Sequence, residues 1–341
     1  MNPIAYKRCV SRVLANPVLL SGVRLGKRVK LFQAMQYLKH PCDINTLASE
    51  LHLKEPYLKE LIHSYVSSEV MTLTPDKKII VPDWTIFKEA FLDPELTYLR
   101  PFEKVAPILE KCFEENGPAG YTHDEAPYVL DYVRTLRQNY NIPLAMELSQ
   151  LISVHADSYT DILDVGCGTG DLTIPLASTL GSSSVYGCDI SVKAITAANM
   201  ASYKVDNVSF GIEDIHNLPK SWGGKYNVIL MFDVLHDLQY PEKAMKQLLN
   251  VLKKDGILII VDPKVSSDPR KNIGNIQAAQ ALTLSTWWCV PSSSCDHGSG
   301  NGVGWGWENK EVFLRNMGLN VRSRVCLIKS DYNYAYVCRR K

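Results

Sequence analysis

Hydrophobic positions change their spacing along the chain, and this change divides the sequence into regions of different secondary structure. Up to about residue 85 they recur at helical spacing, and an alternating stretch at 71–81 predicts two short strands. Helical spacing continues to about residue 150 around a polar loop at 116–127. From residue 159 onward short apolar runs alternate with amphipathic stretches, which is typical of a parallel, doubly wound α/β sheet.

The N-terminal region has the element order of a winged helix. Asp43 can cap a first helix, a turn at 52–54 leads to a second helix, and 71–81 would form the wing. The second helix, 55–66, would be the recognition helix of a DNA-binding protein. Residues 1–90 hold 13 basic and 8 acidic side chains without a clustered basic stripe, so we do not expect nucleic-acid binding. Dimerisation and substrate capping suit this region better.

These patterns predict three parts: a winged-helix domain at 1–85, a helical connector at 86–150 and an α/β domain at 151–341. Within the last part, 268–307 interrupts the alternation with an apolar helix and a glycine-rich loop, and we expect it to be a lid insertion over the substrate. Seven apolar runs predict a Rossmann-like, seven-stranded sheet; they are 161–165, 184–189, 208–212, 226–232, 257–262, 321–328 and 332–339.

Composition and charge are those of an ordinary globular protein. Hydrophobic residues make up 46% of the chain, charged residues 21%, and the net charge of +1 predicts no strong attraction to nucleic acid or acidic lipid. No apolar window approaches the ~18 residues of a membrane span, and the first residues lack the apolar core of a signal peptide. Nine scattered cysteines do not suggest a disulfide framework. We therefore expect a reduced, cytoplasmic protein without a membrane segment.

A metal site is not predicted either. Cys289, Cys295 and His297 are close in sequence, but their spacing matches no common zinc motif and a second ligand pair is missing.

A glycine-rich turn after the first strand of the sheet carries the strongest chemical signal. The stretch 161–171, DILDVGCGTGD, is an apolar strand, then Gly166, Gly168 and Gly170, and then the start of a helix. This strand, turn and helix form the backbone of a nucleotide-type cofactor site. A dinucleotide turn would place its third glycine at position 171, where this chain has Asp171.

The acid-x-GxGxG form of the turn resembles motif I of the class I S-adenosylmethionine (SAM) dependent methyltransferases. LKKDGILIIVD, before and through the fifth strand, resembles a second signature of that family. The resemblance covers about 155–265 and implies SAM as cofactor, with S-adenosylhomocysteine as product. It implies these cofactor-binding residues: Asp164, Gly166, Gly168, Gly170, Asp189, Ile190, Asp214, Ile215, Phe232 and Asp233. Among them Asp164 would hold the ammonium group of SAM, Asp189 the ribose hydroxyls and Asp214 the adenine amino group.

His236 is the candidate catalytic base. It follows the fourth strand, and histidine has a pKa suited to taking the proton of a hydroxyl nucleophile. His-Asp-Leu at 236–238 resembles the His-Asp-Trp segment of plant-type small-molecule O-methyltransferases, which also carry an N-terminal winged-helix dimerisation domain. In that family the histidine is the base and an acid near the end of strand five, here Asp262, orients it.

The match to the plant enzymes has gaps. Leu238 replaces the tryptophan, and their second acid has no clear counterpart, since Glu308 is equally well explained as an acid in the first turn of a helix. The connector and the insertion look closer to other winged-helix methyltransferases. Alternatively, His236 only caps the following helix or packs on the cofactor.

Aromatic residues indicate the kind of substrate. Trp287, Trp288, Trp305 and Trp307 lie in the insertion and suggest an aromatic or cationic substrate, although we expect two of the four to pack the lid instead. Tyr121 is a further substrate candidate.

The sequence thus predicts a homodimeric enzyme that methylates a hydroxyl oxygen of a small molecule. Three alternatives stay open: an N-methyltransferase in which His236 only positions the amine, a SAM-responsive DNA-binding regulator, and an inactive SAM-binding partner protein.

Overall fold

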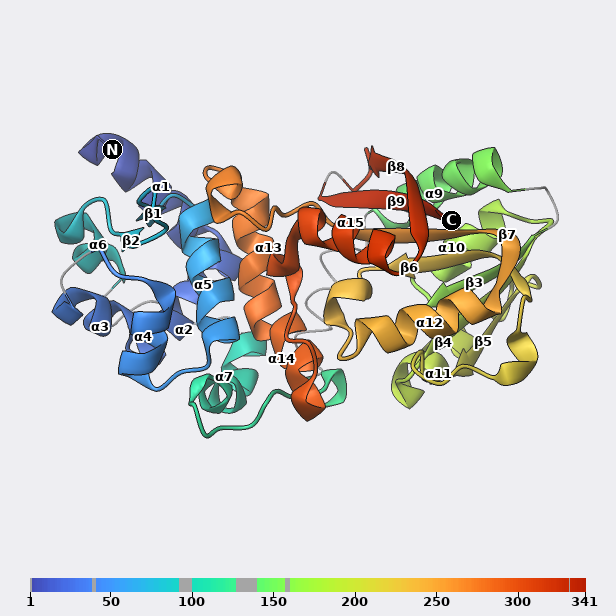
Figure 1. The fold of residues 1–341 in the computed structure, drawn as a ribbon, viewed down its shortest axis with the longest axis horizontal. Helices are drawn as coiled ribbons and strands as arrows, with labels where there is room; N and C mark the ends of the chain where they lie inside the picture. Colours follow the sequence, from blue (N-terminus) through green and yellow to red (C-terminus); the bar gives the residue numbers. More distant parts are fainter. Residues whose placement is uncertain (1, 39–40, 92–99, 127–139, 157–159, 331) are drawn as a thin grey trace. The chain divides into compact units, whose positions relative to one another are not determined.

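The chain forms two compact units in the computed structural model (Figure 1). The N-terminal unit comprises 1–132 and 265–307, and the C-terminal unit comprises 133–264 and 308–341. The structure describes all residues except 1, 39–40, 92–99, 127–139, 157–159 and 331, so that two stretches of the predicted connector, 92–99 and 127–139, lie outside the described residues. Within the described ranges no helix is long and apolar enough to cross a bilayer.

The N-terminal unit is mostly helical. Its main elements are α1 (Pro3–Ala15), α2 (Pro17–Arg28), α3 (Leu31–Leu38), α4 (Ile44–Leu51), α5 (Glu55–Ser67), β1 (Thr72–Leu73), β2 (Ile79–Ile80), α6 (Trp84–Phe91), α7 (Arg100–Phe113), α13 (Ile276–Trp287) and α14 (Cys289–Ser294). Asp43 caps α4 as predicted, because its carboxylate accepts a hydrogen bond from the Thr46 N–H at 2.8 Å. The strands β1 and β2 pair antiparallel, so the helix, helix and hairpin order expected of a winged helix is present.

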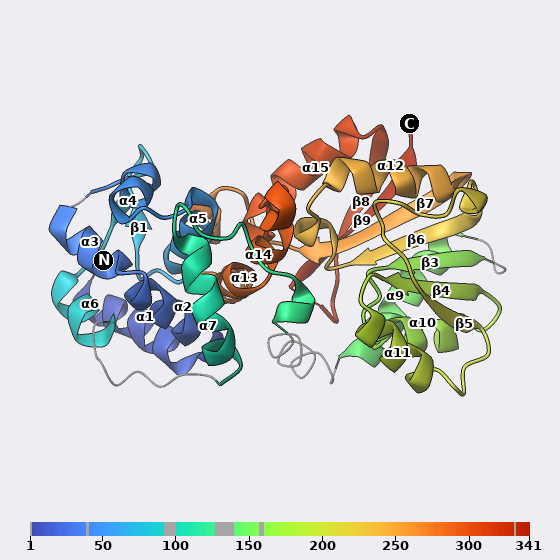
Figure 2. The same cartoon turned by 90° about the horizontal axis from the view of Figure 1, so that it is seen from below.

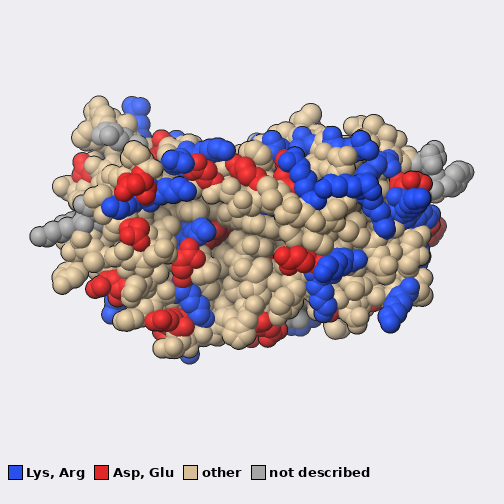
Figure 3. Space-filling view, in the orientation of Figure 1, with Lys and Arg blue, Asp and Glu red and all other residues tan. Residues whose placement is uncertain are grey.

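The predicted recognition helix, α5, lies inside this unit. Ten of its 13 residues are buried, and α13 packs along it. The Ser64 hydroxyl donates to the Ala279 carbonyl at 2.9 Å, and the Glu60 carboxylate accepts from the Gly304 N–H at 2.7 Å. On the face drawn in Figure 3, acidic and basic side chains alternate over this unit. Little of α5 is therefore left to enter a DNA groove.

The insertion groups with this N-terminal unit, so the compact units differ from the predicted boundaries at 85 and 150. Its apolar helix is α13, whose buried alanines, Ala278, Ala279 and Ala281, suit close packing against a neighbouring helix. The stretch expected to be a glycine-rich loop, 292–306, contains the end of α14 and two short 3-10 helices. The apolar character of α13 is explained by its contact with α5.

The C-terminal unit is a seven-stranded sheet with helices on both faces, as predicted. Figure 2 shows α12 and α15 on one face and α9, α10 and α11 on the other. Its elements are α9 (Asn141–His155), β3 (Asp161–Val165), α10 (Thr173–Thr179), β4 (Ser184–Asp189), α11 (Val192–Ala201), β5 (Val208–Ile212), β6 (Tyr226–Phe232), α12 (Pro241–Val251), β7 (Leu252–Pro263), α15 (Gly306–Asn316), β8 (Leu319–Cys326) and β9 (Asn333–Arg340).

The strand order of this sheet is β5-β4-β3-β6-β7-β9-β8, and β9 runs antiparallel to both of its neighbours. From β3 the chain proceeds outward through β4 and β5, then returns to β6 on the other side of β3. Open α/β sheets bind ligands outside the carboxyl ends of their strands at such a reversal. The fold therefore places a ligand site where β3 and β6 end.

Candidate active site

The glycine turn follows β3 at this reversal. Gly166, Gly168 and Gly170 have φ angles of +71°, +55° and +73°, a left-handed region that glycine adopts without strain. The N–H of Gly166 donates to the Cys188 carbonyl at 2.7 Å, which ties the turn to β4. A Cβ atom added at Gly166 would lie 2.4 Å from Cγ2 of Val234, just after β6. The turn is thus enclosed by both neighbouring strands.

Gly166→Ala is expected to destabilise the fold more than Gly168→Ala. Left-handed backbone costs alanine about 1–2 kcal/mol at either position, and at Gly166 the methyl group also meets Val234, which adds about 1–3 kcal/mol. A Cβ at Gly168 meets no atom within 4 Å. Urea unfolding of both variants measures the difference, and equal free energies of unfolding would contradict the enclosed turn.

Asp189 ends β4 and reaches the glycine turn. Its Oδ2 accepts from the Gly168 N–H and its Oδ1 from the Ser191 N–H, both at 2.9 Å. A carboxylate has about four acceptor sites, so both oxygens can accept a further hydrogen bond. The position and the spare acceptor capacity agree with the predicted contact to ribose hydroxyls.

Asp164 lies in β3, below the turn, with 2% of its surface exposed. Its Oδ2 accepts a hydrogen bond from the Thr173 hydroxyl at 2.6 Å. Burial raises the pKa of Asp164 to about 7, although the bond from Thr173 opposes the shift. A cationic group beside this carboxyl would favour its ionised form. Asp164 therefore fits the ammonium group of SAM.

Two further polar residues of the predicted set hold partners within the chain. The Asp214 carboxylate accepts from the backbone N–H of His216 at 2.8 Å and lies 2.9 Å from the His216 ring nitrogen Nδ1. Asp233 adopts a φ of +53°, and its carboxylate accepts from the Asn333 side chain at 2.7 Å. His216 and Asn333 belong to no motif, so the sequence offered no signal for either.

The apolar members of the predicted set suit an adenine ring. Ile190 is 71% exposed, which is unusual for isoleucine, and Ile215 and Phe232 are half-buried. Together with the carboxylates of Asp164 and Asp189, these residues offer an acid for a cation, acceptors for ribose and apolar surface for a base. The polar and apolar groups at this edge of the sheet therefore fit SAM.

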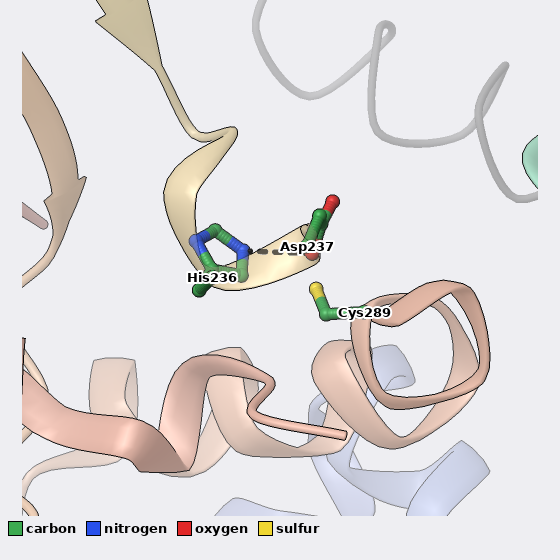
Figure 4. Close-up of side chains that lie close together, drawn as sticks. All are labelled: His236, Asp237 and Cys289. Atoms are coloured by element: carbon green, nitrogen blue, oxygen red, sulfur yellow. Dashed lines mark ion pairs between the residues drawn. The ribbon is translucent and has the colours of Figure 1, made fainter. Parts of the chain in front are cut away.

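His236 lies in the short 3-10 turn Leu235–Asp237 that follows β6. Its side chain is buried, and its Nδ1 lies 2.7 Å from Oδ1 of Asp262 on β7, the partner that the resemblance to plant-type O-methyltransferases implies. Figure 4 shows its other ring nitrogen, Nε2, facing Asp237, whose Oδ1 lies 3.2 Å away. The imidazole is therefore placed between two carboxylates.

These carboxylates decide the protonation of the ring. Burial by itself lowers the pKa of His236, but Asp262 and Asp237 outweigh it and raise this pKa to about 9. Burial by itself raises the pKa of Asp262, but the positive charges of His236 and Lys310 outweigh burial and hold this pKa below its usual value. At pH 7 the pair is an imidazolium and a carboxylate. Lys310 lies beside the second oxygen of Asp262, and this contact was not predicted from the sequence. Glu308 lies in the first turn of α15, as expected.

The predicted substrate residues belong to the N-terminal unit. Trp287 is 1% exposed and packs against a phenylalanine ring, and the Tyr121 hydroxyl, also buried, donates to the Trp287 carbonyl. Trp288 is buried and stacks on His123 with 4.1 Å between ring centroids, whereas Trp305 is half-buried. Packing explains Trp287, Trp288 and Tyr121 within this unit, and a contact with substrate stays a prediction.

Comparison with known proteins agrees with this geometry. A family model described as a methyltransferase domain matches residues 156–293. The mitochondrial ubiquinone biosynthesis O-methyltransferase of Candida albicans is 32% identical over 108 residues, covering 30% of this chain and 32% of that protein. The ribosomal protein L11 methyltransferase of Lactobacillus johnsonii is 32% identical over 166 residues, covering 47% and 41%. The chain thus spans about a third to two fifths of the length of these curated relatives.

Solved structures extend the likeness of the fold to almost the whole chain. An O-methyltransferase family 2 protein from Planctomyces limnophilus, in complex with apigenin, has a TM-score of 0.65 at 13% identity, covering 99% of this chain and 95% of that one. Identity this low concerns the fold alone. The family match supplies the assignment of the domain, and the glycine turn at the strand reversal agrees with it. The chain therefore carries a methyltransferase domain, built on the fold of the SAM-dependent methyltransferases.

Proposed function

We propose that the protein transfers the methyl group of SAM to a hydroxyl oxygen of a small molecule. The observation that carries this proposal is His236, buried after β6 with the Asp262 carboxylate on its Nδ1. Bound SAM supplies an electrophilic methyl group. The residues of this chain bind and orient the two reactants, exclude water and take up the hydroxyl proton. We assign the last task to His236.

The hydrogen bond to Asp262 determines which nitrogen acts. Because the carboxylate accepts from Nδ1–H, the neutral ring carries its proton there and Nε2 is the basic atom. The pKa of His236, about 9, lies close to the pKa of a phenol, ~10, so moving a proton from the phenol to the imidazole costs little free energy. Asp237, 3.2 Å from Nε2, stabilises the imidazolium that results.

Methylation of a phenolic acceptor is expected to accelerate about tenfold per pH unit until pH is about 9. The base must be neutral, and below the pKa of His236 the neutral fraction rises with pH. Initial rates with methyl-labelled SAM between pH 6 and 10 measure this dependence. Two acceptors with different hydroxyl pKa values are the control, since a midpoint belonging to the enzyme is common to both. A rate that is flat from pH 6.5 to 8.5 would exclude His236 as the base.

N-methylation is a second candidate, and Asp237 is the observation that favours it. A carboxylate beside Nε2 can accept a hydrogen bond from the N–H of a neutral amine, which leaves the nitrogen lone pair free to attack the methyl group, and the methylated ammonium product then loses its proton to water. His236 would then only position the acceptor, and its replacement would have a small effect on the rate. A panel of aromatic amines, assayed beside the phenols, separates the two reactions.

We further infer that the protein acts as a cytoplasmic homodimer that joins through its N-terminal unit. The helix, helix and hairpin order of this unit supports dimerisation of the winged-helix type, and none of the nine cysteines, all of them described, forms a disulfide, which suits a reducing compartment. Light scattering on the eluted protein distinguishes a dimer from a monomer.

A further inference from the structure

Lys310 is a completely buried lysine. It lies on α15 with none of its surface exposed, and among the residues that the structure describes no other lysine or arginine is in the interior. An ammonium group leaves water only where an opposite charge compensates for the lost hydration. The reason for burying Lys310 has to lie in its partner.

That partner is the carboxylate that also faces His236. The Lys310 Nζ lies 2.7 Å from Oδ2 of Asp262, and the His236 Nδ1 lies 2.7 Å from Oδ1 of the same carboxylate. Asp262 is itself fully buried. Because each oxygen has its own cationic neighbour, the carboxylate cannot rotate without losing one of them. The direction in which Asp262 faces the imidazole therefore depends on Lys310.

The balance of charge gives Lys310 a second effect. With Lys310 in place, the side chains of Asp237, His236, Asp262 and Lys310 carry no net charge when the ring is protonated and one negative charge when it is neutral. Without Lys310 the remaining side chains would carry one negative charge when the ring is protonated and two when it is neutral. Two uncompensated negative charges in a buried cluster strongly disfavour the neutral ring. Since a base has to be neutral, Lys310 makes the reactive form of His236 accessible.

Building on the function proposed above, we propose that Lys310 is a positioning residue for His236: it binds Oδ2 of Asp262, thereby orients the imidazole and opposes its protonation. Within the C-terminal unit the charged groups that act on His236 are Asp262 on β7, Asp237 in its own turn and Lys310 on α15. Tyr336 on β9 lies near Asp262, but burial raises the pKa of its hydroxyl, so it stays neutral.

The test is an NMR titration of His236 in the full-length protein with isotope-labelled histidine. The chain has eight histidines, and the His236 resonance is identified by its absence in His236→Gln. Lys310→Met is expected to raise the pKa of His236 by about one unit, because a positive charge is lost from a buried site nearby. Lys310→Arg keeps the charge and is expected to leave the pKa unchanged.

Two further variants make the outcome decisive. Lys253→Met is the matched control, because Lys253 pairs with Asp161 at 3.6 Å in the same unit, where β3 begins. If Lys310→Met does not fold, Lys310→Gln carries the same expectation, since its amide can donate to Asp262 without a charge. An unchanged pKa of His236 in the neutral variants, or an equal rise in Lys253→Met, would overturn the proposal.

The pH–rate profile provides the second readout. In Lys310→Met the midpoint of methyl transfer is expected to move to higher pH by the same amount as the NMR titration. The titration needs no substrate, so it decides the role of Lys310 even if the wild-type protein methylates no hydroxyl acceptor. Failure of the proposed reaction and failure of the proposed role of Lys310 are therefore distinguishable.

Discussion

Replacement of His236 by alanine is expected to lower kcat for methylation of a hydroxyl acceptor by about 100-fold or more. The neutral ring would otherwise take the acceptor's proton on Nε2 while Asp262 holds Nδ1. His236→Gln is expected to lose a similar factor, because an amide can donate to Asp262 but cannot accept a proton near pH 7. Initial rates at saturating SAM measure both variants.

The control for this experiment is another histidine of the same unit. His155 lies in the last turn of α9 and is only half-buried, and His155→Ala is expected to leave kcat unchanged. Calorimetric titration with SAM checks that the His236 variants still bind the cofactor. A fall of less than about threefold in both His236 variants would remove the base from the mechanism and favour methylation of an amine, which needs no strong base.

Asp189→Ala is expected to weaken the binding of SAM and of S-adenosylhomocysteine about 100-fold or more. Hydrogen bonds to a charged group contribute about 1.5–3 kcal/mol each, and the ribose would lose two of them. The variant also removes the acceptor of the Gly168 N–H, which loosens the glycine turn. Calorimetric titration of the purified protein with each ligand measures the two affinities.

Asp206→Ala is the matched control for this variant. Asp206 is an exposed acid just before β5, at the opposite end of the parallel strands from the glycine turn. Its loss changes the net charge equally and is expected to leave both affinities unchanged. Micromolar binding that survives in Asp189→Ala would assign the ribose to another residue, and no binding even to the wild-type protein would leave the glycine turn with a structural role only.

The central part of the sheet was predictable because its strands share one pattern. β3, β4, β6 and the part of β7 from Ile257 onward are apolar runs that a polar residue or glycine ends, and a strand buried on both faces requires such a run. The first five residues of β7, LKKDG, were not predicted to belong to the strand. The carboxyl ends of parallel strands meet at one edge, so the polar residues that follow these strands lie at that edge. The distance of 2.7 Å between His236 Nδ1 and Asp262 Oδ1 agrees with the pairing that the resemblance to the plant-type enzymes implies.

The rest of the candidate site depends on contacts that no local pattern encodes. Lys310 is four residues from Leu314 on a helix rich in charged residues, and its sequence neighbours predict a solvated position. Only the packing of α15 on the sheet brings its ammonium group to Asp262. Asp237 was read as part of the segment with His236, and nothing in the spacing showed that its carboxylate would face Nε2.

The insertion illustrates the same limit at the level of whole elements. The apolar positions of α13 predict a buried helix, but they do not say which surface covers it. In the structure α5 covers α13, and the Ser64 hydroxyl donates a hydrogen bond to the Ala279 carbonyl. The tryptophans near α13 therefore take part in the packing of the N-terminal unit.

The contact between α5 and α13 also affects how the protein is made. Ser64 and its partner Ala279 are 215 residues apart in the chain. At about 5–20 residues per second, a ribosome needs roughly 10–40 s to synthesise that interval. During this time the apolar face of α5 has left the ribosome without the helix that covers it, while the strands of the C-terminal unit emerge. The N-terminal unit, although its synthesis begins first, therefore cannot complete its core until β3 to β7 of the C-terminal unit have been made, and its uncovered apolar surface is prone to aggregate during that period.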